Sequence, residues 1–440
     1  MKNKLILAPI LSLLISGPAL VAQEKGNELS LTLKEAQDYA IQNNKMVKSA
    51  KLTVEGSQAD MWTTIASGLP QVSASAGYTD NLKVGVFFIT MNGVPTLLQI
   101  GSKFSIPLNV QASMPLFNAS YYIGIETVKL AQKLAASNLQ STEIDTRQSV
   151  ASAYYLILVS EESLRILKDN LANLNETLKS TKAMFNTGMA EASDVDQMAS
   201  NVTMMENSFS NLQNNIEVNY NLLRFQLGVK ADTKIALTET LEDMVKEMDI
   251  NELLSKEFNA ASNIQYDLVE KQEQMSKLNL KNQKAKVLPM VSAVYSASKS
   301  GMGNTMSSLI WPNSSFLGMQ MSIPIFASGQ RYSNIQKAKI DLAKARNTKE
   351  MVSDQLQMQE KQLRFNLQSA NMQYMSQKGN VEVAKRVYAS MENKYKQGMA
   401  SSLDLTQANS LYLMAENNYI SSLMNLLQTK LALDKLLNNM

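Results

Sequence analysis

The feature of this sequence that most constrains its fold is an internal duplication. The segment Gly188–Ala190 (Gly-Met-Ala) recurs unchanged as Gly398–Ala400. A second matching pair, Pro115–Phe117 and Pro324–Phe326, lies upstream in the same order. Self-similarity on this scale means that one supersecondary unit is used twice. We predict that each unit runs helix, strand pair, long helix, turn and helix.

Apolar residues spaced by threes and fours predict that the long segments of each unit are helices packed along their length. This spacing runs through Val195, Met198, Val202, Met205 and Phe209 and through Leu405, Ala408, Tyr412, Ala415 and Tyr419. We expect helices over about 32–67, 120–186, 193–228, 259–287, 331–397 and 402–438. The longest would each span roughly 100 Å at about 1.5 Å per residue. Two shorter helices stacked beside each long one would give a rod of even height.

Between the helices, each unit has segments of alternating polarity that predict strands, within about 70–115 and 289–324. Asn109, Gln111 and Gln320 lie on the polar face, and apolar residues alternate with them. About ten alternating residues is the length of a tilted transmembrane strand, although a half-buried soluble sheet gives the same pattern. After the N-terminal segment, the sequence has no run of about 18 apolar residues that could form a membrane helix. Because four strands cannot close a barrel, a membrane sheet would have to be shared between chains.

The first residues of the chain predict a signal peptide over 1–22. Lys2 and Lys4 precede the apolar run Leu5–Ile15, and small residues lead to a cleavage point after Ala22. This order of charge, apolar run and small residues is typical of secretory signals. We therefore expect the protein to be exported across the inner membrane.

Composition argues against several classes of function. The sequence has no Cys, which excludes disulfides, thiol chemistry and a lipidated N-terminal cysteine. It has no His, so the commonest general base and metal ligand is missing. A formal net charge of +3 is too small for the basic face that nucleic acid requires. The 27 Met residues are scattered and favour adaptable packing over metal binding. We expect no enzyme activity, no cofactor, no metal and no nucleic acid.

The turns that follow the long helices carry a family resemblance. Phe185–Gly188 followed by Ser193–Val195 is copied by Tyr395–Gly398 followed by Leu403–Leu405. With the duplicated Pro-Leu/Ile-Phe segments, these motifs make the chain resemble the outer membrane efflux protein family. These are the TolC-like channels of tripartite efflux and type I secretion systems.

The resemblance implies a mixed, mainly helical fold and a homotrimer. Four strands per chain would contribute to a twelve-stranded outer-membrane barrel, continued by a periplasmic α-helical barrel. The mature chain would divide into a first repeat (23–228), an equatorial connecting segment (229–258) and a second repeat (259–440). The implied function is an exit channel that passively conducts substrates from an inner-membrane pump of the RND or ABC type. The implied partners are that pump, a periplasmic adaptor (membrane fusion) protein and outer-membrane lipid. The alternative is a periplasmic coiled-coil scaffold or adaptor without a channel.

The resemblance also assigns roles to individual residues. Gly188, Met189, Gly398 and Met399 would form the turns that meet the adaptor, and Asp194, Asp404 and Gln407 would line the tunnel entrance. Asn109, Gln111 and Gln320 would face the barrel lumen. A purely structural interpretation stands beside these roles: glycines that end helices need positive φ, and the two aspartates lie where a carboxylate stabilises a helix start.

Overall fold

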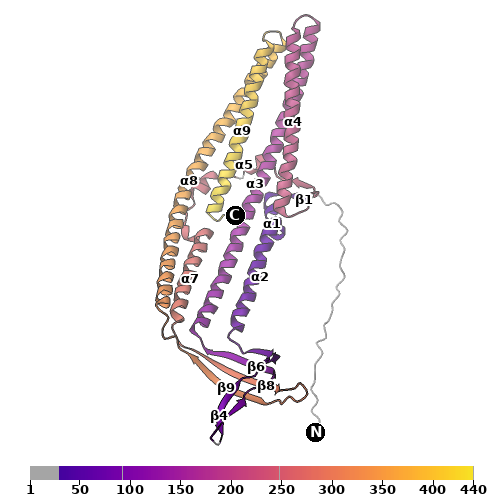
Figure 1. Ribbon diagram of the computed structural model, residues 1–440. Helices are drawn as coiled ribbons and strands as arrows, with labels where there is room; N and C mark the ends of the chain where they lie inside the picture. The colour runs from indigo at the N-terminus through magenta and orange to yellow at the C-terminus, as the bar shows by residue number, and fades with distance from the viewer. Residues whose placement is uncertain (1–28, 92, 247, 440) are drawn as a thin grey trace, which may run out of the picture.

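Figure 1 shows the computed structural model, a rod of long helices with a β-sheet at one end. The structure describes residues 29–91, 93–246 and 248–439. The expected signal peptide, 1–22, lies outside the described residues. Among the helices of the described ranges, none contains a stretch long and apolar enough to cross a membrane.

The order of the elements follows the predicted duplication. In chain order they are β1 (Leu29–Leu31), α1 (Leu33–Asn43), α2 (Lys45–Ala66), β2 (Gln71–Ala76), β3 (Thr79–Asp80), β4 (Val86–Met91), β5 (Val94–Gln99), β6 (Phe104–Phe117), α3 (Ala119–Asn186), α4 (Ala192–Leu227), β7 (Ile235–Leu237), α5 (Leu241–Lys246), α6 (Ile250–Ser255), a 3-10 turn η1 (Ala260–Ser262), α7 (Ile264–Ala285), β8 (Met290–Gly303), β9 (Asn313–Ser322), α8 (Gln330–Lys396) and α9 (Ser402–Leu436).

The two longest helices, α3 and α8, run the length of the rod (Figure 1). In the half that carries the turns, α4 packs against α3 and α9 against α8. In the half next to the sheet, their places are taken by α2 and α7. The helix α3 also contacts α7 and α9 of the second copy, and so joins the two units. Two half-length helices therefore stack beside each long one, as the sequence predicts.

One buried asparagine in each copy holds this stacking together. Asn44 accepts hydrogen bonds from the first amides of α2, at 2.7 Å from Met46, and donates to the carbonyl of Gln226 at the end of α4, at 2.7 Å. In the second copy, Asn263 accepts from Gln265 at 2.9 Å and donates to the carbonyl of Leu436 in α9, at 3.0 Å. Each asparagine thus begins one short helix and pairs a C-terminal carbonyl of the other.

The predicted helix over 32–67 is interrupted at Asn44 for this reason. Its backbone is extended (φ −58°, ψ 134°), so α1 ends and α2 begins there. Gly228 ends α4 at the same joint with φ +73°, and a Cβ at this position would lie 2.5 Å from the carbonyl oxygen of Asn43. Only glycine fits that approach without a backbone shift.

The sheet at the end of the rod has the order β2-β6-β8-β9, with β3 continuing β2 alongside β6. Every pairing in it is antiparallel. Asn109 lies opposite Ser75 and Ser298, and Gln320 lies opposite Ser292. Residues opposite each other in a pair share a face, so the register gathers the predicted polar residues on one face and the apolar residues on the other.

The prolines of this region lie where the ladders are interrupted. Pro107 falls between the stretches of β6 that pair with β2 and with β3. Pro115 lies beyond the end of β2 and at a register shift between β6 and β8. A proline has no amide hydrogen to donate, so at these positions it costs the sheet few hydrogen bonds.

Four short elements, β1, β7, α5 and α6, lie at the middle of the rod, and we call them the belt (Figure 1). All but β1 fall within the segment predicted to be equatorial. The strands β1 and β7 pair in parallel. The guanidinium of Arg364 on α8 donates to the carbonyls of Leu254 and Lys256 at the end of α6. The largest cluster of buried apolar residues lies beneath this belt and draws on both copies.

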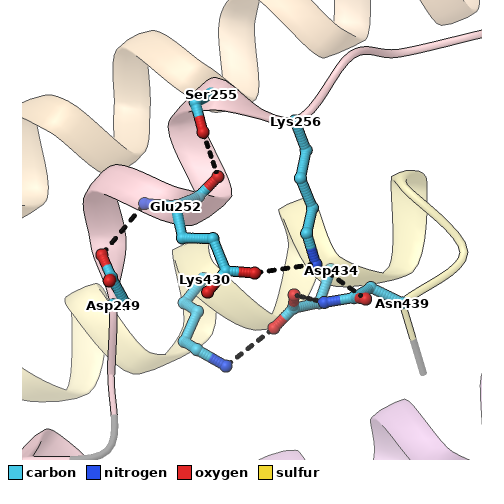
Figure 2. A network of polar contacts seen from close by, with 7 residues as sticks. All are labelled: Asp249, Glu252, Ser255, Lys256, Lys430, Asp434 and Asn439. Atoms are coloured by element: carbon cyan, nitrogen blue, oxygen red, sulfur yellow. Dashed lines mark hydrogen bonds and ion pairs between the residues drawn. The ribbon is translucent and has the colours of Figure 1, made fainter.

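Figure 2 shows how the C-terminal end of α9 joins the belt. Lys256 donates to Asn439 at 3.1 Å, and Asn439 donates to Asp434 at 3.0 Å. Asp434 is buried and also accepts from Lys430 at 2.8 Å. On the belt side, Asp249 caps α6 by accepting from the amide of Glu252 at 2.9 Å. The end of the second copy is thereby tied to the connecting segment.

We predict that Asn44→Ala and Asn263→Ala each lower stability by about 1–3 kcal/mol, because each loses a helix cap and leaves a buried carbonyl unpaired. Asn44→Ser keeps an acceptor for the cap and should lose less. Chemical unfolding of the detergent-solubilised protein, followed by helical circular dichroism, measures the change. Asn211→Ala, at an exposed position of α4, is the matched control. Equal midpoints for Asn44→Ala and Asn211→Ala would contradict the role of the joint.

Candidate functional site

The two turns at the free end of the rod are built alike. Gly188 and Gly398 have φ of +74° and +70°. The amide of Met189 donates to the carbonyl of Met184, and that of Met399 donates to Lys394, each at 2.8 Å. This is the Schellman pattern of helix ends. The turns place Met189 and Met399 in solvent, with 76% and 67% of their surface exposed.

Asp194 and Asp404 begin the returning helices as capping residues. The amide of Glu191 donates to Asp194 at 3.0 Å, and the amide and hydroxyl of Ser401 donate to Asp404 at 3.1 and 2.7 Å. The pKa of Asp404 lies below its ordinary value because the Ser401 hydroxyl and amide stabilise the carboxylate. Both aspartates therefore cap the starts of their helices, as the structural interpretation expects.

Asp194 has a second partner that sequence reasoning did not identify. The hydroxyl of Ser402, at the start of α9, donates to its carboxylate, so this bond joins the hairpins of the two copies. The pKa of Asp194 lies below its ordinary value because of the Ser402 hydroxyl and then the Glu191 amide. A second link nearby joins the hydroxyls of Thr181 and Tyr395 at 2.7 Å, and both residues are buried.

Gln407 lies one turn beyond Asp404 on the exposed surface of α9. Ala400, in the turn before α9, packs against a cluster formed by Tyr388, Tyr395 and Leu405. The ring of Tyr388 stacks on Tyr412 with centroids 5.7 Å apart. The free end thus has a small aromatic core of its own, separate from the large core under the belt.

The predicted lumen residues lie together at the other end of the molecule. Asn109, Gln111 and Gln320 are exposed on the polar face of the sheet. On the opposite face, Leu317 and Met319 each expose 79% of their surface. In the described part of the chain, no group of three or more acidic residues is placed to hold a metal ion. The arrangement offers polar and apolar surfaces rather than a reaction centre.

Comparison with known proteins identifies the chain. The sequence profile described as outer membrane efflux protein matches residues 37–229 and 269–439. The chain belongs to the outer membrane efflux protein family. The two matched segments fall on the two copies. This is a family of outer-membrane channels and not of enzymes.

Individual relatives are distant in sequence and close in fold. The outer membrane protein TolC of Vibrio cholerae is 23% identical over 189 residues, which cover 41% of this chain and 40% of that protein. The fold is similar to VceC of Vibrio cholerae (TM-score 0.72, 14% identity, covering 92% of this chain and 95% of that one). It is also similar to MtrE of Neisseria gonorrhoeae (TM-score 0.72, 16% identity, 92% and 88% covered). These findings confirm the predicted family and fold class.

We predict that Ser402→Ala loosens the start of α4, because the carboxylate of Asp194 loses its partner in the other hairpin. Amide hydrogen exchange at 189–196 should speed up several-fold at neutral pH, where Asp194 is ionised. Since the pKa of Asp194 is lowered in the fold, its contribution is present above its ordinary pKa and fades as the pH falls through the lowered value. Ser401→Ala should speed exchange at the start of α9 and leave 189–196 unchanged. Equal exchange at 189–196 in wild type and Ser402→Ala would refute the link.

Proposed function

We propose that this chain is the outer-membrane exit channel of a tripartite efflux or type I secretion system. Three copies together would form a twelve-stranded barrel and a tunnel of helices. The observation that carries this proposal is a sheet with two free edges and one exposed apolar face. The family consists of such channels, and those of known assembly are trimers. Substrates would pass through without chemical change.

The edges of the sheet support a cyclic assembly. Within the described residues, β2 and β9 each pair on one side only. The strand β9 of one copy can therefore pair with β2 of the next, in the antiparallel sense of every other pair in the sheet. An open edge cannot lie in lipid because its amides and carbonyls would be unpaired. Closure through neighbouring copies removes every edge.

The edge helices carry matching apolar stripes. On α8, Met351, Met358, Phe365 and Met372 follow one another at intervals of seven residues, and each is more than half exposed. On α4, at the opposite side of the helical layer, Met204, Val218 and Phe225 are also more than half exposed at multiples of seven. A spacing of seven residues is typical of helices that pack along their length. Phe365 and Met372 lie in the half of α8 that carries the turns, and we infer that this half packs against α4 of the next copy. Met351 and Met358 lie in the half next to the sheet, at the level of the neighbour's α2.

The turns at Gly188 and Gly398 are proposed as the contact for a periplasmic adaptor. The exposure of Met189 and Met399 on two similar turns supports this proposal, because a trimer would then present six similar exposed methionines. The pump beyond the adaptor, of the RND or ABC type, follows from the family resemblance. Three copies of Asp404 would place three carboxylates at the tunnel entrance, a ring that favours cations. Gln407 adds no second ring. The segment 229–258 is proposed as the equatorial belt of this tunnel.

A periplasmic scaffold or adaptor without a channel is the second candidate. It would account for the packed helices but leaves the exposed apolar face of Leu317 and Met319 without a purpose. Contact of that face with outer-membrane lipid is therefore the stronger proposal.

Substitutions on the two sheet faces test the barrel. Met319→Arg should prevent assembly, since an Arg within the bilayer on the lipid side costs up to about 2–4 kcal/mol. Gln320→Arg, on the neighbouring residue, should assemble and change only ion selectivity. The measurements are trimer yield from outer membranes and single-channel conductance in planar bilayers. Similar trimer yields for the two variants would show that the faces are assigned wrongly, and wild-type protein without conductance would count against a channel.

Substitutions in the turns test the adaptor contact. Met189→Glu combined with Met399→Glu should abolish export in cells while trimer yield stays at the wild-type level, because the changed side chains are exposed. Met414→Glu, on a methionine of α9 that is 60% exposed and lies away from the turns, is the control and should export normally. Export is measured by accumulation of a fluorescent pump substrate. Normal export by the double variant would place the adaptor contact elsewhere.

A further inference from the structure

The hairpin of β4 and β5 is the part of the first copy that has no counterpart in the second. It lies in the connection between β3 and β6, whereas β8 and β9 are joined by the short segment 304–312. Figure 1 shows the hairpin at the end of the molecule opposite the helix turns. No charged residue occurs between Lys83 and Lys103. This hairpin accounts for the extra length of the first strand pair.

Both faces of the hairpin are apolar. Phe87 and Phe88 are consecutive and point to opposite faces, and they expose 61% and 77% of their surface. Leu97, which lies opposite Phe88 in the register, is 59% exposed. Val86, on the same face as Phe88, is 56% exposed. A hairpin that faced water on one side would expose polar side chains there, whereas the described side chains expose large apolar groups on both faces.

The hairpin also has two open edges. Among the described residues, β4 and β5 pair only with each other. In hydrocarbon, the amides and carbonyls of both edges would be unpaired, which lipid does not tolerate. In water, the aromatic side chains would be exposed and the edges would template aggregation. Pairing with the same hairpin of other copies satisfies both edges, and closing the strands into a ring turns one apolar face to an interior that the copies share.

We propose that the β4–β5 hairpins of three copies join edge to edge and form an apolar lid over the outer mouth of the channel. The strand β5 of one copy would pair with β4 of the next, so that six strands close without a free edge. The inference rests on the proposed trimer. Each copy supplies one hairpin, so a complete lid needs all three. An apolar constriction excludes water and charged solutes until it opens.

Cysteine cross-linking tests the contact between hairpins. The sequence has no Cys, so a single introduced cysteine gives an unambiguous signal. Because β5 lies between successive β4 strands, two Phe88 positions are too far apart for a direct disulfide, so Phe88→Cys should give covalent dimers in outer membranes when a short bismaleimide is added. Leu317→Cys, more exposed than Phe88 but on the outer face of the sheet, should remain monomeric on a non-reducing gel. Monomeric Phe88→Cys in a sample that is trimeric by chemical cross-linking would overturn the lid and leave the trimer intact.

Reagent access from outside the cell tests the barrier. In Asn109→Cys, the thiol lies on the polar face of the sheet, and a membrane-impermeant maleimide added to intact cells reaches it through the outer mouth. Replacing 82–101 by the nine residues 304–312 of the second copy should speed labelling on the order of tenfold, because the constriction is removed. Replacing Phe88 and Leu97 by Ser should speed it in the same direction.

The two readouts separate the lid from the channel. Conductance of the wild-type trimer in planar bilayers reports the proposed function, and labelling of Asn109→Cys reports the lid. Equal labelling rates with and without the hairpin, in a protein that conducts, would refute the lid. Insertion of the hairpin into lipid predicts that equality together with monomeric Phe88→Cys, and would be identified by both results.

Discussion

The structure depends on two joints where short helices meet end to end. A helix leaves unpaired amides at its start and unpaired carbonyls at its end, and stacking α4 on α2 would bury both sets. Asn44 resolves this because one side chain accepts from the amides and donates to a carbonyl. Asn263 does the same in the second copy. Without these joints, α3 and α8 would have no continuous partner along the rod.

The belt is placed at the height of these joints, and this placement has a physical reason. The joints are where the short helices are interrupted. The largest buried cluster of the described residues lies there, with Tyr154 fully buried beneath β1 and donating to the carbonyl of Leu31 at 3.1 Å. Arg364 of α8 donates to the carbonyls at the end of α6. The connecting segment thus packs over the joints, and its own short elements gain the contacts that they need to fold.

Most of the architecture could be predicted from the sequence because its signals are periodic and occur twice. The limits of α3 and α8 lie within about two residues of the predicted ones. The strand pairing of the belt could not be predicted, because β1 and β7 have three residues each and pair across the whole first copy. The break at Asn44 was also missed, since asparagine within a helical pattern carries no local sign that Gln226 will lie opposite it. The roles of Asp194 and Asp404 as helix caps were visible from their spacing, whereas the bond from Ser402 depends on how two hairpins pack.

The departures from the repeat carry the most information about how three copies would work together. Two equal units per chain would give six equivalent hairpins around the tunnel. The sequence breaks this equivalence at both ends of the rod. At the turns, Ser402 binds Asp194 within the chain, but the first-copy residue that matches Ser402 is Ala192, which has no hydroxyl. In the proposed trimer, the contact between neighbouring copies therefore lacks the bond that holds the two hairpins of one chain together. Contacts within a chain are reinforced, and contacts between chains are left free to separate.

At the sheet, the hairpin of β4 and β5 occurs once per chain, so that end of the proposed trimer also has threefold rather than sixfold symmetry. The duplication gives the proposed tunnel a wall of similar helices. The differences between the copies lie at its two ends, the helix turns and the β4–β5 hairpin, where a tunnel would open and close.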